Sequence, residues 1–257
     1  MKFVTGILLP IMVFATPTIA AKPLNIYTEE WSPISFSVDG KATGLAVQVV
    51  EEIQKRINNH DPIKVVPWAR GWKMLTEQPN VMLFTVTRTE ERENMFTMIG
   101  PVAIGTTNFY ALKNSGIKIT NLDDAKSARA IGVYRASVEE RMLLEQGFTN
   151  VAASSTPLLS ARQLIKNRID LWCNANLTAP SILADAGASI DDVESLYTIS
   201  ANHLYIAFSK GTSNEVIKQW QNSLEAIKED GTFATIYHAW LPNDAPPLQT
   251  ERIGLAH

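Results

Sequence analysis

Hydroxyl and guanidinium groups are concentrated in one short stretch of the chain, residues 85–92. Thr85, Thr87 and Arg92 follow directly after the apolar run at 81–84. An arginine offers a planar fork of N–H donors that pairs with both oxygens of a carboxylate, and hydroxyls and free N–H groups at a helix start can satisfy the remaining lone pairs. The stretch therefore predicts a carboxylate-binding site at the end of a strand. A simple ion pair between Arg92 and a neighbouring glutamate is the alternative.

The elements that would position this site alternate between strand and helix along most of the chain. This alternation predicts an α/β fold with mostly parallel sheets flanked by helices. Two apolar runs, at 108–112 and 204–208, separate two such α/β units. Placed side by side, these runs would form a two-stranded hinge between two lobes, with a ligand cleft between them. We expect the Pro-rich tail from Asn243 onward to be frayed.

The predicted division assigns residues 1–20 to a signal peptide, 21–110 and 206–257 to lobe 1, and 111–205 to lobe 2. The first segment has a basic start at Lys2 and an apolar run too short to span a bilayer. A cleaved export signal explains this pattern, and a retained membrane anchor is the alternative. Export would place the mature protein in the periplasm.

The cysteine content and the net charge of the chain argue against several classes of protein. Cys173 is the only cysteine, so the mature chain has no internal disulfide and no lipid-anchoring cysteine, and we expect Cys173 to be a buried packing residue. The formal net charge is −3, without a basic stripe, which argues against a nucleic-acid partner. The four histidines are scattered, and phosphate-binding loops and nucleophile elbows are missing. We therefore expect a binding protein without metal or cofactor rather than an enzyme.

Several motifs, taken in order, resemble those of bacterial periplasmic solute-binding proteins of the polar amino acid type, family 3. They are the segment at 29–36, Gly44 at the start of a helix, Thr87-x4-Arg92, and the run at 224–240. The resemblance covers essentially the whole mature chain. It implies a type II periplasmic binding protein fold, a small amino acid or organic acid as ligand, delivery to an inner-membrane ABC permease, a monomer, and no cofactor.

The resemblance also implies roles for matched positions. Thr87 and Arg92 would hold the ligand carboxylate, with donors from the backbone around Thr85. Trp31 matches an aromatic residue that packs on the ligand side chain, and the turn at 134–137 matches a second-lobe loop whose N–H groups meet the carboxylate. The predicted ligand-binding residues are Glu29, Glu30, Trp31, Trp68, Arg70, Thr85, Thr87, Arg92, Tyr134, Arg135, Ser137, Asn174 and Asn176.

The sequence departs from the family pattern on the ammonium side of the site. Amino acid binders carry an aspartate after the strand at 169–173, where this chain has Ala175 between Asn174 and Asn176. Glu29 or Glu30 could replace that aspartate. A buried ammonium without an anionic partner costs several kcal/mol, so this substitution decides whether the ligand is an amino acid. The ligand identity therefore stays open.

Two other functions are compatible with the same fold. A dehydratase-like periplasmic enzyme would use Glu29 or Glu30 as its general acid or base. A ligand-sensing subunit would report the bound solute to a membrane signalling protein. Trp68 and Arg70 could face the cleft in any of these cases, although packing in the core is the alternative for Trp68.

Overall fold

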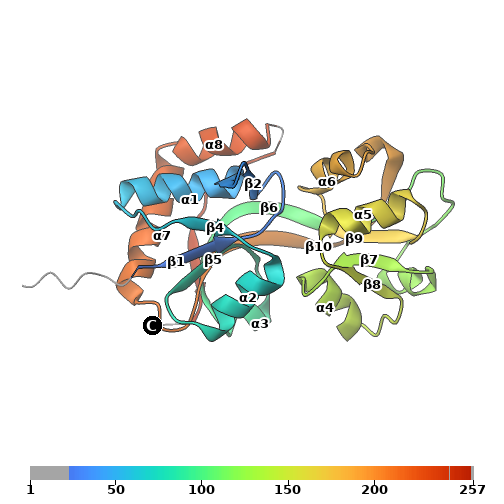
Figure 1. Cartoon of the computed structure of the whole chain (residues 1–257), viewed down its shortest axis with the longest axis horizontal. Helices are drawn as coiled ribbons and strands as arrows, with labels where there is room; N and C mark the ends of the chain where they lie inside the picture. The colour runs from blue at the N-terminus through green and yellow to red at the C-terminus, as the bar shows by residue number, and fades with distance from the viewer. Residues whose placement is uncertain (1–22, 243, 256–257) are drawn as a thin grey trace, which may run out of the picture.

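The computed structural model describes residues 23–242 and 244–255, and the signal peptide predicted at 1–20 lies outside them. The described residues form two lobes that share one nine-stranded sheet (Figure 1). In spatial order its strands are β4 (Ile63–Val65), β1 (Asn25–Thr28), β5 (Val81–Thr87), β10 (Val193–Phe208), β6 (Thr97–Leu112), β9 (Leu171–Ala175), β7 (Ile131–Tyr134) and β8 (Val151–Ser154), with β11 (Glu251–Gly254) paired to β6.

The predicted fold class is confirmed, because each lobe contains three parallel strands. In the first lobe β1 pairs in parallel with β4 and β5, and in the second lobe β7 pairs in parallel with β8 and β9. The strands β6 and β10 are antiparallel and run through both lobes as the hinge (Figure 1). A small hairpin of β2 (Phe36–Val38) and β3 (Lys41–Thr43) stands apart from the main sheet.

The two hinge strands are longer than predicted, and their register differs. Asn108 pairs with Thr198, and Leu204 pairs with Ala103, so the runs at 108–112 and 204–208 lie at opposite ends of the hinge. The expectation that these two runs lie side by side was wrong. The residues between them in each strand are partly polar and exposed, so the sequence shows only the apolar end of each strand.

Along both hinge strands, the chain passes from one lobe to the other slightly earlier than predicted. Phe109 and Tyr110 pack in the hydrophobic clusters of the second lobe, whereas Leu204 and Tyr205 pack in those of the first. The predicted limit at 110 therefore lies in a part of β6 that packs in the second lobe, and the predicted limit at 205 lies in a part of β10 that packs in the first.

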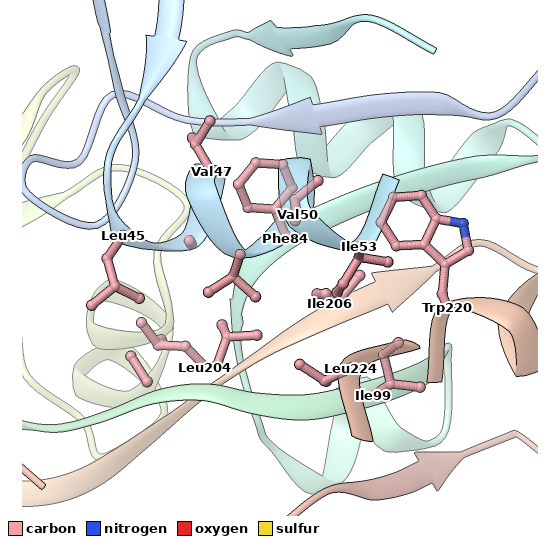
Figure 2. Close-up of a cluster of buried hydrophobic side chains, with 14 of the residues drawn as sticks. Leu45, Val47, Val50, Ile53, Phe84, Ile99, Leu204, Ile206, Trp220 and Leu224 are labelled. Atoms are coloured by element: carbon pink, nitrogen blue, oxygen red, sulfur yellow. The ribbon is translucent and has the colours of Figure 1, made fainter. Parts of the chain in front are cut away.

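Helices cover both faces of the first-lobe sheet. The larger core lies beneath α1 (Leu45–Arg56), α7 (Asn214–Glu229) and α8 (Thr232–Trp240). Figure 2 shows side chains of α1 and α7 meeting those of β5, β6 and β10 in this core. Gly44 precedes α1 with φ 117°, and a Cβ there would lie 2.7 Å from the carbonyl oxygen of Ile34, so only glycine fits.

The opposite face of the first lobe carries the elements nearest the predicted site. The helix α2 (Trp68–Glu77) and the single turn α3 (Glu90–Glu93) flank the carboxyl end of β5. In the second lobe, α5 (Pro157–Ile165) and α6 (Ala179–Asp185) cover one face and α4 (Val138–Glu145) packs near the other. Short 3-10 turns occur at Leu122–Ser127 and Ile190–Asp192.

The C-terminal segment is held against the first lobe over residues 249–255, so the prediction that it frays was wrong there, and residues 243 and 256–257 lie outside the described residues. The strand β11 pairs antiparallel with β6 over Glu251–Gly254. The buried ammonium of Lys228 on α7 donates hydrogen bonds to the carbonyl oxygens of Pro101, at 2.8 Å, and Gln249, at 2.6 Å. Backbone pairing and this lysine fix the tail, which proline content alone does not reveal. Among the described residues, none of the helices has the length and apolarity needed to cross a membrane.

Candidate functional site

Arg92 is buried between the end of β5 and the first-lobe aromatic residues. Its side chain is 3% exposed, and its Nη1 donates a 2.8 Å hydrogen bond to the carbonyl oxygen of Thr87. The guanidinium lies 4.7 Å from the ring centroid of Trp72 and 5.3 Å from that of Trp68. Arg92 has no ion pair within the described chain, whereas Arg88 pairs with Glu93 at 2.6 Å. The simple ion pair considered for Arg92 is therefore made by Arg88.

Local structure explains why Arg92 points inward. Thr89 caps α3, and its hydroxyl accepts a hydrogen bond from the Arg92 N–H at 3.2 Å. Burial lowers the pKa of Arg92 to about 10, partly opposed by the negative charge of Glu139. The side chain therefore remains a cation at neutral pH, with guanidinium N–H groups beyond the one held by Thr87.

Glu29, which directly follows β1, is the buried acidic residue of the first lobe. It is 5% exposed, and its Oε2 has no hydrogen-bond partner among the described residues. Burial first, and the nearby Glu139 second, raise the pKa of Glu29 to about 8, against the opposing effect of Arg92. Glu30 behaves differently, because it is exposed and accepts hydrogen bonds from the backbone and hydroxyl of Ser37. Of these two predicted acidic residues, only Glu29 lines the cleft.

Thr85 adopts an uncommon backbone conformation at the end of β5. Its φ is 71°, in the left-handed region that costs a β-branched residue on the order of 1–3 kcal/mol. Its hydroxyl donates to the carbonyl oxygen of Phe84 at 2.5 Å. Ala136, on the second lobe, also has a positive φ of 60°. Thr85 lines the cleft, whereas the Ala136 carbonyl accepts a hydrogen bond from Trp68 of the first lobe.

The two lobes touch directly at the cleft. The backbone N–H of Trp68 donates to the Tyr134 hydroxyl at 3.0 Å, and its indole Nε1 donates to the Ala136 carbonyl at 2.9 Å. Trp31 packs against hydrophobic clusters of both lobes. The Ser181 hydroxyl donates to the Ser32 carbonyl at 2.5 Å. The lobes are therefore closed on one another.

A small cavity of about 40 Å³ lies where most of the predicted residues meet. Its first-lobe wall contains Glu29, Trp31, Trp68, Thr85, Thr87 and Arg92, and its second-lobe wall contains Tyr134, Ser137 and Asn174. The structure thus brings together nine of the thirteen predicted residues. Arg70 and Arg135 are exposed and line neither this cavity nor its neighbour, and Asn176 instead accepts a hydrogen bond from the Thr106 N–H in the hinge at 2.7 Å.

A second cavity of about 460 Å³ opens on the other side of Arg92. It lies between α3 of the first lobe and α4 of the second, with hinge residues as its floor. Thr87, Arg92, Val138 and Glu139 line both cavities. The two spaces are therefore neighbouring chambers of one cleft, which we name the small chamber and the large chamber.

Glu139 is the important site residue that the sequence did not reveal. It lies in the first turn of α4, lines both chambers, and accepts a hydrogen bond from the Thr107 hydroxyl at 3.2 Å. Its charge acts on the pKa values of both Glu29 and Arg92. An acidic residue after the helix cap Ser137 is also a common stabiliser of a helix start, which hides its place in the cleft.

The buried Cys173 confirms its predicted packing role, since it is 2% exposed and belongs to a second-lobe cluster. It also lines the small chamber. Within the described ranges, no group of three or more histidine, cysteine, aspartate or glutamate side chains is placed to hold a metal ion. The wall of the small chamber instead offers one buried cation, two carboxylates and several aromatic rings.

Known proteins share this architecture. A probable histidine-binding protein of Campylobacter jejuni is 21% identical over 219 residues, which cover 80% of this chain and 79% of that protein. The crystal structure of a histidine kinase sensor domain with similarity to periplasmic binding proteins matches with a TM-score of 0.78, at 18% identity, over 88% of this chain and 99% of that domain. The arginine-, lysine-, histidine-binding protein ArtJ of Geobacillus stearothermophilus matches with a TM-score of 0.75, at 18% identity, over 87% and 97%.

The family comparison covers nearly all of the described chain. The model of the bacterial extracellular solute-binding proteins, family 3, matches residues 24–243, which include both lobes apart from β11, the hinge and every residue of the two chambers. The predicted resemblance is confirmed, and the chain belongs to the bacterial extracellular solute-binding proteins, family 3.

Proposed function

We propose that this protein binds an α-amino acid between its lobes, with the α-carboxylate at Arg92 and the α-ammonium at Glu29. One observation carries the proposal: a buried guanidinium and a buried, unpartnered carboxylate line the same small chamber. A zwitterionic head group carries the charges complementary to this guanidinium and this carboxylate. The relatives named for binding histidine, or arginine, lysine and histidine, support the same ligand class.

Physical chemistry favours this arrangement on both sides. Hydrogen bonds between a guanidinium and a carboxylate are charge-assisted and strengthened by low local polarity. The unpartnered Oε2 of Glu29 is costly in the free protein, and an ammonium would satisfy it. Glu29 would thereby replace the aspartate that is missing at Ala175. On this proposal, the ligand is an amino acid despite the departure from the family pattern at Ala175.

Ligand entry requires the lobes to separate. The small chamber holds about 40 Å³, far below the roughly 300–1,000 Å³ of ordinary ligand pockets, and Trp68 and Tyr134 close it. The ligand would bind an open form and stabilise a closed form by contacting both lobes. We propose that this binding occurs in the periplasm and that the closed, monomeric protein delivers its ligand to an ABC permease in the inner membrane.

A thermal-shift and calorimetric screen tests the proposal. Each proteinogenic amino acid would be compared with its deaminated and decarboxylated analogues on the mature protein. A ligand at a hundred times its dissociation constant should add about 2.7 kcal/mol of stability. We expect an amino acid to stabilise the protein when neither analogue does. Equal stabilisation by the deaminated analogue would contradict the role of Glu29, and conversion of the bound compound would point to the enzymatic alternative.

A further inference from the structure

We propose that Glu251, on the C-terminal strand β11, is a positioning residue for Arg92. It acts through the turn α3, which carries Arg92 and to which a chain of ion pairs joins Glu251. Glu251 itself lines neither chamber. Its effect on ligand affinity rests on the proposed function, in which Arg92 binds the ligand carboxylate.

The turn α3 does not hold Arg92 in place by itself. It comprises Glu90–Glu93 only, and isolated helices shorter than about 12–15 residues are marginal in water. The bond to Thr87 and the two indole rings fix the guanidinium end of Arg92. A binding group has to be held within about 0.5 Å of its productive position, and this requires support at the backbone end as well. That support comes from outside the turn, at the C-terminal strand.

The end of the chain lies directly against the segment that follows α3. The N–H of Leu255 donates to the carbonyl oxygen of Phe96 at 3.1 Å, and the hydroxyl of Thr97 donates to the carbonyl oxygen of Leu255 at 2.8 Å. Gly254 has φ 93°, and a Cβ there would overlap the carbonyl oxygen of Phe96, so only glycine lets the two backbones approach this closely. The strand β11 is therefore fixed against the carboxyl side of α3.

A chain of charged side chains joins β11 to both ends of α3. Arg88, which precedes the turn, pairs through Nε with Glu93 at 2.6 Å and through Nη1 with Glu251 at 3.2 Å. Glu251 also accepts a hydrogen bond from the hydroxyl of Tyr205, whose ring packs in a first-lobe cluster. Because Arg88 and Glu93 flank Arg92 in the sequence, this chain ties both ends of the turn to a fixed point on the sheet.

The ion pairs add little to stability, because water reaches their charges. The side chains of Arg88 and Glu251 are 37% and 45% exposed, and exposed ion pairs contribute little to folding. Loss of a screened surface charge acts with opposite sign on the carboxylate and the ammonium of an amino acid, so by itself it changes the affinity little. A displaced Arg92 would lower the affinity. Binding, rather than stability, is therefore the property that Glu251 should affect.

The position of Arg92 can be followed without any ligand by the NMR signal of its Nε–H group. Because Arg92 is buried beside the rings of Trp68 and Trp72, ring currents should shift this signal away from those of exposed arginines. Its loss in the spectrum of Arg92→Lys assigns the signal. Glu251→Gln should move it toward the position of exposed arginines. Asp230→Asn is the matched control, since Asp230 is also 45% exposed and pairs with another first-lobe arginine at 2.7 Å.

Calorimetric titration of the mature protein with each proteinogenic amino acid measures the consequence for binding. For every amino acid that binds, Glu251→Gln should weaken binding by about threefold to tenfold, and Asp230→Asn should leave it unchanged. In the Arg92→Lys background, Glu251→Gln should have no further effect, because the group that it positions is absent. Tyr205→Phe removes the hydroxyl that holds Glu251, so it should act in the same direction and add nothing to Glu251→Gln.

The outcomes separate this proposal from the proposed function. An unchanged Arg92 signal in Glu251→Gln would overturn the positioning role, whether or not an amino acid binds. Equal losses of affinity in Glu251→Gln and Asp230→Asn, a shifted signal without a loss of affinity, or an additive effect in the Arg92→Lys background would overturn the effect on binding. Absence of binding by every amino acid would remove the proposed function, while the Arg92 signal would still decide whether Glu251 positions that side chain.

Discussion

The backbone N–H of Trp68 in the first lobe donates a 3.0 Å hydrogen bond to the hydroxyl of Tyr134 in the second. The indole N–H of the same residue reaches the carbonyl of Ala136. The closed arrangement is therefore held by the protein's own groups. These contacts stabilise the closed form relative to the open form. A ligand therefore has to supply less binding free energy to make the closed form dominant.

We expect Trp68→Phe to shift the ligand-free protein toward the open form. The phenyl ring keeps most of the packing but loses the indole N–H, and the lost hydrogen bond is worth about 0.5–1.5 kcal/mol. Small-angle scattering should then show a larger radius of gyration. Trp240→Phe is the matched control, because its indole N–H bonds to Gln48 within the first lobe. Equal effects of the two substitutions would contradict a closing role for Trp68.

Arg92→Lys should weaken binding of the preferred amino acid by about a hundredfold. The lysine keeps the charge, but it loses the planar donor fork, the bond to Thr87 and the contact with the two indoles. Isothermal titration would measure the change. Arg70→Lys is the control, since Arg70 is exposed and outside both chambers. If the Arg92 variant keeps its affinity, the ligand carboxylate lies elsewhere.

Binding at pH 7 should release about one proton from Glu29. In the free protein the pKa of Glu29 is about 8, so the carboxyl is mostly protonated at this pH. An ammonium beside it favours the charged form and lowers that pKa. Titrations in two buffers with different ionisation enthalpies would count the released protons. Glu29→Gln should abolish the release and Glu30→Gln should preserve it, whereas a wild-type protein without buffer dependence would refute the contact.

The stability of the ligand-free protein should fall as the pH rises from about 4.5 to about 8. Over this range the folded protein holds a proton on Glu29 that the unfolded chain has lost, so the Glu29 contribution is complete below the unfolded pKa and vanishes above the folded one. The slope from this group is at most about 1.4 kcal/mol per pH unit. Urea denaturation would measure the free energy of unfolding of the wild type and of Glu29→Gln at several pH values. The difference between the two proteins should change with pH.

Lys228 should have the opposite pH dependence at higher pH. Burial lowers the pKa of Lys228 to about 7, partly opposed by Glu251. Between about pH 7 and 10.5 the unfolded chain binds more protons, so stability from this group increases with pH. Lys228→Met should remove that increase in denaturation experiments and loosen the tail toward limited proteolysis. Lys218→Met, on the exposed side of the same helix, should do neither.

The sequence predicts the fold well because alternating apolar patterns are local. It misplaces the hinge register because the polar middle parts of β6 and β10 resemble loops. In the site, the segment of Thr87 and Arg92 is contiguous and could be predicted. Arg70 lies two residues after Trp68 on the same helix, a spacing that turns it away from the cleft. The proximity of Glu139 to Glu29 arises only when the lobes meet, so no pattern within either segment could indicate it.

The pairing of β11 with β6 has a consequence for the order of folding. The second lobe is built from one continuous stretch of chain, from the second half of β6 to the first half of β10, so it can form as soon as that stretch is complete. The first lobe combines strands from near both ends of the described chain, including β11. The lobe that carries Glu29 and Arg92 is therefore complete only after β11 has been synthesised, and a chain truncated before residue 251 would lack a strand of that lobe.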